Sequence, residues 1–153
     1  MNFTDKTAIV TGGSRGIGFT IAKVLCEAGT NVMICGRNKE TIQKAVDSLK
    51  LFGTVAGMQC DVTNYDEVCA MMQATKKKFG GIQILINNAG IAHNGDIEEQ
   101  TPETWTETIN TNLTGVFYCC KEVIPSMKER GGYIINISSR AGTNPYAGDI
   151  AYT

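Results

Sequence analysis

The sequence has little proline, a single histidine and no excess of charge of either sign. Its 14 Lys and Arg residues nearly balance its 15 Asp and Glu residues, which gives a formal net charge of −1. Nucleic acid is not an expected partner, because it requires a dense positive face on the protein. The lone histidine, His93, also argues against a zinc site built from cysteine and histidine, so no metal is expected.

Long apolar runs are missing as well. No run approaches the roughly 18 residues that cross a bilayer, so no membrane partner is expected. The first six residues lack the apolar core of a signal peptide. The cysteines form no Cys-x-x-Cys pair, and we interpret them as reduced residues, mostly in the core, of a cytoplasmic protein. They are Cys26, Cys35, Cys60, Cys69, Cys119 and Cys120.

What the sequence does contain is an alternation of short apolar runs with helical patterns. The runs are typical of parallel strands buried on both faces, and they lie at 8–10, 32–35, 55–60, 84–86 and 133–137. Apolar residues recur on one helical face in the segments between them. Those residues are Ile17, Ile21, Val24, Leu25 and Ala28, then Ile42, Ala45, Val46 and Leu49, then Val68, Met71, Met72, Thr75 and Phe79. Right-handed crossovers then predict one α/β domain, a doubly wound parallel sheet in the order 3-2-1-4-5.

Helix boundaries have their own signals. Thr63 is expected to be the N-cap of a capping box, and Thr101 precedes a proline in the position that favours a helix start. Gly29 and Gly53 follow helical patterns, where a residue with positive φ is expected.

A glycine-rich turn, Thr11-Gly-Gly-Ser-Arg-Gly-Ile-Gly18, connects the first strand to the first helix. Glycines allow a sharp turn and a close approach of the backbone to a pyrophosphate, which the helix N-terminus also attracts. The spacing Gly-x-x-x-Gly-x-Gly differs from the Gly-x-Gly-x-x-Gly fingerprint. A methyltransferase, another nucleotide binder and a turn without a ligand therefore stay open at this point.

The end of the second strand bears on the choice of cofactor. An NAD site usually has an acidic residue there for the ribose hydroxyls, and none is present. Arg37 follows the strand and Arg15 lies in the glycine-rich turn. Guanidinium groups match the geometry of a phosphate, so these residues favour NADP(H) over NAD(H). The alternative interpretation is that Arg37 is an ordinary solvated arginine.

Six motifs in order resemble the short-chain dehydrogenase/reductases, in the branch that includes 3-oxoacyl-carrier-protein reductases and hydroxysteroid dehydrogenases. They are the turn 11–18, Asp61-Val62, Asn87-Asn88-Ala89-Gly90, Asn112-Leu113-Thr114-Gly115, Ile137-Ser138-Ser139 and Tyr152. The resemblance covers the whole sequence and disfavours a methyltransferase. It implies a Rossmann fold and an oxidoreductase that moves hydride between NADP(H) and a ketone or secondary alcohol. A 3-oxoacyl thioester is the first substrate class to consider.

The resemblance also implies the site residues. Tyr152 is expected to donate the proton in reduction, Ser139 to orient the substrate carbonyl, and Asn112 to help hold a water molecule. Asp61 is expected to meet the adenine ring with its side chain. The full set implied for the cofactor is Gly12, Ser14, Arg15, Gly16, Ile17, Gly18, Arg37, Asp61, Val62, Asn88, Ala89 and Gly90.

The sequence departs from the family pattern at its end. The pattern has a lysine four residues after the tyrosine, where its ammonium group would lower the tyrosine pKa from about 10. That position lies beyond Thr153. We therefore expect residues 1–153 to be an N-terminal part that stops before the remaining strands. The alternative function is a dinucleotide-binding fragment without turnover.

The resemblance further implies a homodimer or homotetramer when the protein is complete. The helical pattern at about 102–127 is the expected interface. Trp105, Ile109, Leu113 and Phe117 recur there at helical spacing, and the alternative is that they belong to the protein's own core.

Overall fold

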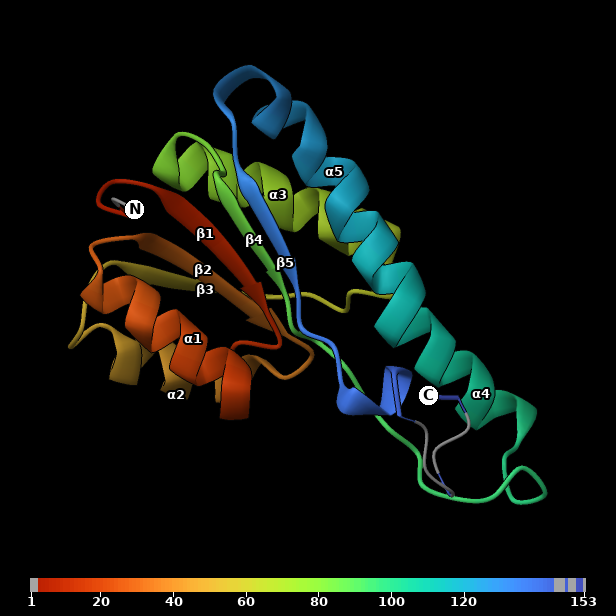
Figure 1. Ribbon diagram of the computed structural model, residues 1–153. Coiled ribbons are helices and arrows are strands. Elements are labelled where there is room, and N and C mark those ends of the chain that lie inside the picture. The colour runs from red at the N-terminus through yellow and green to blue at the C-terminus, as the bar shows by residue number, and fades with distance from the viewer. Residues whose placement is uncertain (1–2, 145–147, 149–150, 153) are drawn as a thin grey trace.

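Five parallel strands form the central sheet of the computed structural model, which describes residues 3–144, 148 and 151–152 (Figure 1). The strands are β1 (Thr7–Thr11), β2 (Asn31–Gly36), β3 (Val55–Gln59), β4 (Ile84–Asn87) and β5 (Tyr133–Asn136). Their order is β3-β2-β1-β4-β5, and every neighbouring pair is parallel. The predicted doubly wound α/β sheet is confirmed.

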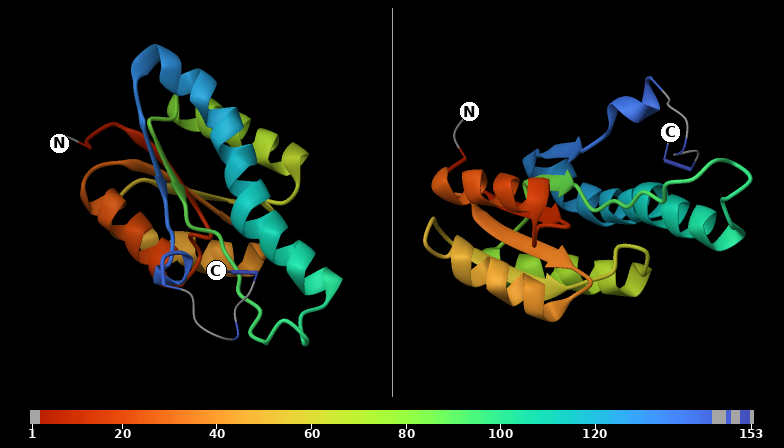
Figure 2. Two further views of the ribbon diagram at one scale, coloured as in Figure 1. Left: turned by 45° about the vertical axis from the view of Figure 1, so that its right-hand side comes forward. Right: turned by 90° about the horizontal axis from the view of Figure 1, so that it is seen from below.

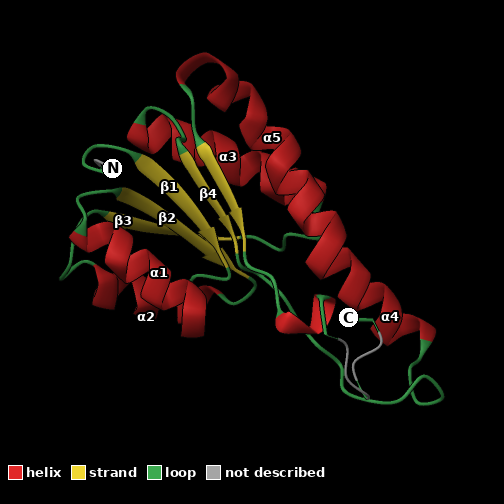
Figure 3. Ribbon diagram, in the orientation of Figure 1, coloured by secondary structure: helices red, strands yellow, loops and turns green. Residues whose placement is uncertain are grey.

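Helices cover both faces of this sheet (Figure 2). On one face lie α1 (Gly16–Glu27) and α2 (Lys39–Leu49), and on the other lie α3 (Tyr65–Phe79) and α5 (Gly115–Arg130). A π-helical turn, η1 (Asn110–Thr114), joins α5 to α4 (Pro102–Ile109). Together α4, η1 and α5 form one long rod that extends past the carboxyl ends of the strands (Figure 3). A short 3₁₀ turn, η2 (Arg140–Gly142), follows β5.

Two apolar clusters hold these layers together, because successive side chains of a strand point to opposite faces. On β1, Ala8 and Val10 pack with α1 and α2, whereas Ile9 packs with α3 and α5. The predicted buried faces of α2 and α3 are confirmed, with Phe79 only partly buried.

The prediction that every strand is buried on both faces is wrong for the two outer strands. β3 alternates between buried and more exposed residues, and all four residues of β5 are exposed. Ile135 keeps 49% of its surface exposed. The physical reason is position, because each of these strands has a neighbouring strand on one side only.

The predicted inward face of α1 is correct only in part. Ile21 and Leu25 pack against the core, but Ile17, Val24 and Ala28 are exposed. The fully buried residues are Gly18, Ala22 and Cys26. These small residues recur every four positions and allow the helix to lie close to the glycine-rich turn and the sheet. Side-chain size therefore outweighed hydrophobicity in setting the rotation of the helix.

One predicted helix start is correct and the other is one residue early. Thr101 caps α4 by accepting a hydrogen bond from the Thr104 N–H group. The cap of α3 is Asn64, whose side chain accepts from two backbone N–H groups of the first turn. Thr63 is instead held by the Asp61 carboxylate through its N–H and its hydroxyl, both at 2.9 Å.

The two glycines expected to have positive φ also differ. Gly29 has φ +79°, as predicted. Gly53 has no positive φ, so that prediction is wrong. A glycine is needed at position 53 for a different reason: a Cβ there would lie 2.6 Å from the carbonyl oxygen of Cys26.

All six cysteines are free thiols. Cys26, Cys35, Cys60 and Cys119 are buried, and Cys69 and Cys120 are half-buried. Within the described residues, no three or more His, Cys, Asp or Glu side chains gather in a way that could hold a metal ion. In the same part of the chain, no helix combines the length and the hydropathy that a membrane span requires.

Candidate functional site

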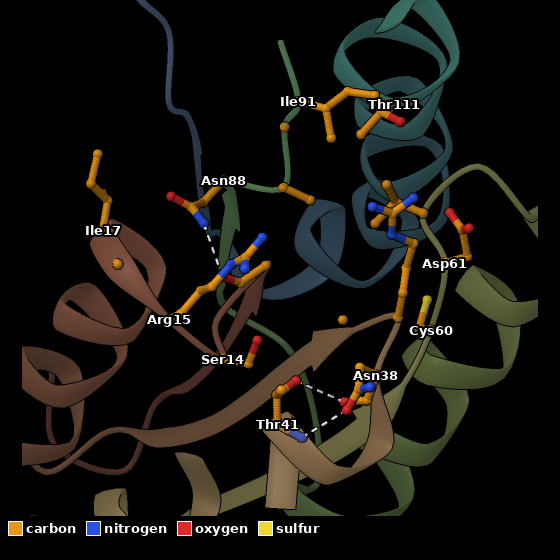
Figure 4. Close-up of a pocket in the computed structure, with 17 residues that line it drawn as sticks. Ser14, Arg15, Ile17, Asn38, Thr41, Cys60, Asp61, Asn88, Ile91 and Thr111 are labelled. Carbon is orange, nitrogen blue, oxygen red and sulfur yellow. Dashed lines mark hydrogen bonds between the residues drawn. The ribbon is translucent and has the colours of Figure 1, made fainter. Parts of the chain in front are cut away.

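A cleft of about 570 Å³ opens at the carboxyl ends of the strands (Figure 4). Its walls come from the segments that follow β1, β2, β3 and β4, and from η1. This is the edge where open parallel sheets bind their ligands. The lining residues are Gly12, Ser14, Arg15, Gly16, Ile17, Gly36, Arg37, Asn38, Thr41, Cys60, Asp61, Val62, Asn88, Ala89, Gly90, Ile91 and Thr111.

The residues that the sequence predicted for a cofactor line this cleft, with the exception of Gly18. Gly18 is buried behind the glycine-rich turn, where a Cβ would lie 2.4 Å from Asn88 Nδ2 and 2.5 Å from the Gly12 carbonyl oxygen. Its role is thus to permit close packing of α1 against the turn.

The glycine-rich turn leaves room for a ligand at the start of α1. Gly16 has φ +56°, and a Cβ there would meet nothing within 4 Å. The N-cap residue, Arg15, makes no side-chain capping bond, so the first N–H groups of the helix are not satisfied by it. Open space beside the first N–H groups and the positive end of a helix suits a pyrophosphate.

Thr11 ties the glycine-rich turn to the segment after β4. Its hydroxyl accepts hydrogen bonds from the N–H groups of Asn88 and Ala89, each at 3.0 Å. In return, the Asn88 side chain donates to the carbonyl oxygens of Thr11 and Gly12, at 2.9 and 3.3 Å. Two walls of the cleft are thereby held at a fixed separation.

The wall after β3 contains an acid and a thiol. Asp61 accepts two hydrogen bonds from Thr63 at one carboxylate oxygen, Oδ1. Its backbone N–H donates to the Glu67 carboxylate at 2.8 Å. Beside it, buried Cys60 forms a hydrogen bond with Cys35, and this bond and burial raise the pKa of the Cys35 thiol well above its ordinary value.

The two arginines of the cleft differ in their partners. The Arg37 guanidinium lies 3.3 Å from a carboxylate oxygen of Glu107, and the other oxygen of Glu107 lies 3.0 Å from His93 Nε2. The Arg15 guanidinium has no ion pair within the part of the chain that the structure describes. The cleft therefore holds one unpaired cation and one that is shared with α4.

A family model described as short chain dehydrogenase matches residues 6–153. The chain belongs to the short-chain dehydrogenase family. It is 42% identical over 151 residues to a protein named 3-oxoacyl-[acyl-carrier-protein] reductase FabG from Chlamydia trachomatis, covering 97% of this chain and 61% of that one. The chain thus spans less than two thirds of the length of this relative.

Solved structures agree with this membership. A short-chain type dehydrogenase/reductase from Mycobacterium ulcerans superposes with a TM-score of 0.95 at 33% identity, covering 99% of this chain and 57% of that one. A xylitol dehydrogenase with bound NAD⁺ superposes with a TM-score of 0.95 at 29% identity, covering 99% of this chain and 60% of that one.

The three residues that were predicted to act in catalysis lie in different settings. Asn112, in η1, accepts from the Ile91 N–H at 2.9 Å and donates to the Ile91 carbonyl at 2.8 Å. Ser139 caps η2, accepting from the Ala141 N–H at 3.1 Å. Tyr152 is half-buried in a turn. Among the described residues, no hydrogen bond joins Asn112, Ser139 and Tyr152.

Sequence reasoning missed several lining residues. Gly36, Asn38 and Cys60 are direct neighbours of predicted residues, and their position after a strand could have indicated them. Asn38 is also a helix cap that accepts from the Thr41 N–H at 2.9 Å. Thr111 had no signal, because the sequence does not fix which side of a helix faces a cleft.

Proposed function

We propose that this protein is an NADP(H)-dependent oxidoreductase that moves hydride between the nicotinamide and a ketone or secondary alcohol. The observation that carries this proposal is the cleft at the carboxyl ends of the strands, with its glycine-rich turn and two arginines, in a chain of this family. A 3-oxoacyl thioester is the proposed substrate class, because the name of the Chlamydia relative states it.

The lining residues fit a dinucleotide. The space beside Gly16 and the start of α1 would take the pyrophosphate, because no side chain fills it. The adenosine would lie toward β2 and β3, between Arg37 and Asp61. The residue directly after β2 is Arg37 and not an acid that could accept hydrogen bonds from ribose hydroxyls. The cleft thus offers two guanidiniums for a 2′-phosphate.

The bound cofactor would supply or accept the hydride. When a carbonyl gains hydride, negative charge develops on its oxygen, which then needs a hydrogen-bond donor and an acid. Ser139 is suited to the first role, because its oxygen accepts from Ala141 and leaves its own O–H group to donate. Tyr152 is the proposed acid. Asn112 would act by holding Ile91 at the cleft wall.

The protein is also proposed to assemble as a homodimer or homotetramer in the cytoplasm. The rod of α4, η1 and α5 exposes Trp105, Leu113 and Phe117, and 63% of the Leu113 surface is exposed. Such an apolar stripe on a helix is typical of an interface. Six free thiols accord with a reducing compartment.

A second candidate function is dinucleotide binding without turnover. The observation that favours it is the exposure of Tyr133, Ile134 and Ile135 on β5, the strand that leads to Ser139. A strand with exposed side chains would hold the position of Ser139 less firmly than a buried central strand would. Tight NADPH binding without reduction of any ketone in a broad panel would support this candidate.

The cofactor proposal is tested by the variant Arg37→Asp. Loss of a charge-assisted phosphate contact typically costs about 1.5–3 kcal/mol, so NADPH binding should weaken about 10- to 100-fold and NADH binding far less. Fluorescence titration of both cofactors measures this. Lys44→Asp makes the same change of charge on the exposed side of α2 and is the matched control. Equal losses for both cofactors would show that Arg37 does not bind the phosphate.

A further inference from the structure

Glu107 contacts two residues that come from different segments, one after β2 and one after β4. One of its carboxylate oxygens lies 3.3 Å from Arg37 Nη1, at the end of β2. The other lies 3.0 Å from His93 Nε2, in the segment that follows β4. Glu107 itself is on α4, one turn before Thr111 in the cleft wall. A single acid on α4 therefore fixes the direction of the cation that the proposed function assigns to the 2′-phosphate.

The backbone at Arg37 is held independently of this acid. The Gln59 side chain donates to the Arg37 carbonyl at 3.0 Å, and Asn38 caps α2 immediately afterwards. Only the side chain of Arg37 is free to change partner. Both members of the pair are well exposed, Arg37 at 62% and Glu107 at 45% of the side chain, and exposed pairs are weak. A phosphate with up to two negative charges can displace such a carboxylate.

We infer that Glu107 determines cofactor specificity by competing with the 2′-phosphate for Arg37. The inference rests on the proposed NADP(H) function. In the free protein the Glu107 carboxylate is paired with the Arg37 guanidinium. When the 2′-phosphate binds, this phosphate and the Glu107 carboxylate both lie beside Arg37 and repel each other. Glu107 therefore lowers the affinity for 2′-phosphorylated dinucleotides and leaves the affinity for the unphosphorylated ones unchanged. Its bond to His93 keeps it beside Arg37 while the guanidinium contacts the phosphate.

The test compares adenosine 2′,5′-bisphosphate with adenosine 5′-monophosphate, which differ only in the 2′-phosphate. Calorimetric titration gives both dissociation constants without any measurement of activity. Glu107→Gln should bind the bisphosphate about 3- to 10-fold more tightly than the unmodified protein does, because it removes a weak pair and a repulsion. Binding of the monophosphate should change less than about twofold, and this also reports an intact fold.

Two further variants separate the possible outcomes. Glu103→Gln removes the same charge one turn earlier on α4, away from Arg37, and should leave both constants unchanged. In an Arg37→Met background, Glu107→Gln should have no effect on the bisphosphate. The inference would be overturned if Glu107→Gln tightened the binding of both ligands equally, or if Glu103→Gln tightened bisphosphate binding as much as Glu107→Gln does. Either result would show an effect of the overall charge of the protein and not of a contact with Arg37.

Failure of the inference differs from failure of the proposed function. If Arg37→Met weakens bisphosphate binding at least tenfold while Glu107→Gln leaves it unchanged or weaker, the cofactor proposal stands and the role of Glu107 is refuted. If Arg37→Met leaves bisphosphate binding unchanged, Arg37 does not contact the 2′-phosphate and both proposals are wrong.

Discussion

Asn112 holds the backbone of Ile91 with both ends of its amide group. Its oxygen accepts the Ile91 N–H at 2.9 Å and its nitrogen donates to the Ile91 carbonyl at 2.8 Å. The resemblance to known dehydrogenases implied a water-holding role for this asparagine. The structure adds a positioning role, because Ile91 lines the cleft and Asn112 belongs to the π-helical turn of the long rod.

Replacing Asn112 with alanine should therefore lower stability. Two hydrogen bonds are lost and two backbone groups of Ile91 are left without their partner, so we expect a loss of about 1–3 kcal/mol in urea denaturation. The matched control is Asn110→Ala in the same turn, where a change within about 0.5 kcal/mol is expected. Equal losses at the two positions would contradict the positioning role.

Gly18→Ala should damage the cleft from behind. The added methyl group would lie 2.4 Å from Asn88 Nδ2 and 2.5 Å from the Gly12 carbonyl oxygen, so both walls must move. Such overpacking costs about 1–3 kcal/mol, and we expect a lower melting temperature together with weaker NADPH binding. Gly142→Ala, where no atom lies within 4 Å of the new Cβ, is the control and should behave like the unmodified protein.

Charges placed on the exposed stripe of the rod should disrupt assembly. Leu113→Glu combined with Phe117→Glu places two carboxylates on side chains that are 63% and 58% exposed. We expect light scattering of the complete protein to show a smaller assembly than without these changes, because an apolar interface does not tolerate unpaired charges. Leu51→Glu alters an 83% exposed leucine after α2 and should leave the mass unchanged. If the unmodified protein, the double variant and Leu51→Glu all have the same mass in solution, the rod is not part of the interface.

The buried thiols should make the fold sensitive to alkali. Burial, together with the nearby Cys60 and Cys120 thiols, raises the pKa of Cys119 from its ordinary value of 9.0 to about 12. The folded protein then keeps a proton that the unfolded chain releases. Stability contributed by this thiol is present below pH 9 and is lost as the pH rises toward about 12, by up to about 1.4 kcal/mol per pH unit.

Urea denaturation at several pH values between 8 and 11 would measure this slope. Cys119→Ala removes one of the thiols with a raised pKa and should make the loss of stability above pH 9 less steep, while Cys26 and Cys35 still contribute to it. Val123→Ala, a change at a fully buried residue one turn later in α5, should lower stability at every pH and keep the slope. An identical slope in Cys119→Ala and the unmodified protein would assign the alkaline instability to other groups.

Much of the fold was predictable because its signals are local. Each strand is a short apolar run, and the order of the strands follows from handedness rules that need no side-chain detail. The glycine-rich turn and Arg37 could be assigned to the cleft for the same reason, since they directly follow strands. The sequence therefore predicted most of the cleft wall.

Features that depend on distant contacts were not predictable. Arg37 and Glu107 are 70 positions apart, and no pattern in either segment indicates that they meet. Asn64 and not Thr63 caps α3, because Thr63 donates two hydrogen bonds to the Asp61 carboxylate. Both residues are good helix caps, so the sequence alone does not show which one is used. The rotation of α1 depends on how closely its glycine approaches Gly12, a packing property of the assembled sheet.

The π-helical turn η1 sets the angular phase between the two halves of the long rod. An α-helix advances by about 100° per residue, and a π turn accommodates one extra residue without breaking the rod. Removing one residue from this turn would therefore restore a regular α-helix and nearly keep the phase between α4 and α5. Removing Thr108 or Ile109 from the α-helical part would instead rotate Glu107 and Trp105 by about 100° relative to α5. The charge beside Arg37 and the outer apolar stripe thus depend on the same helical phase, and a one-residue deletion between Glu107 and η1 would alter both at once.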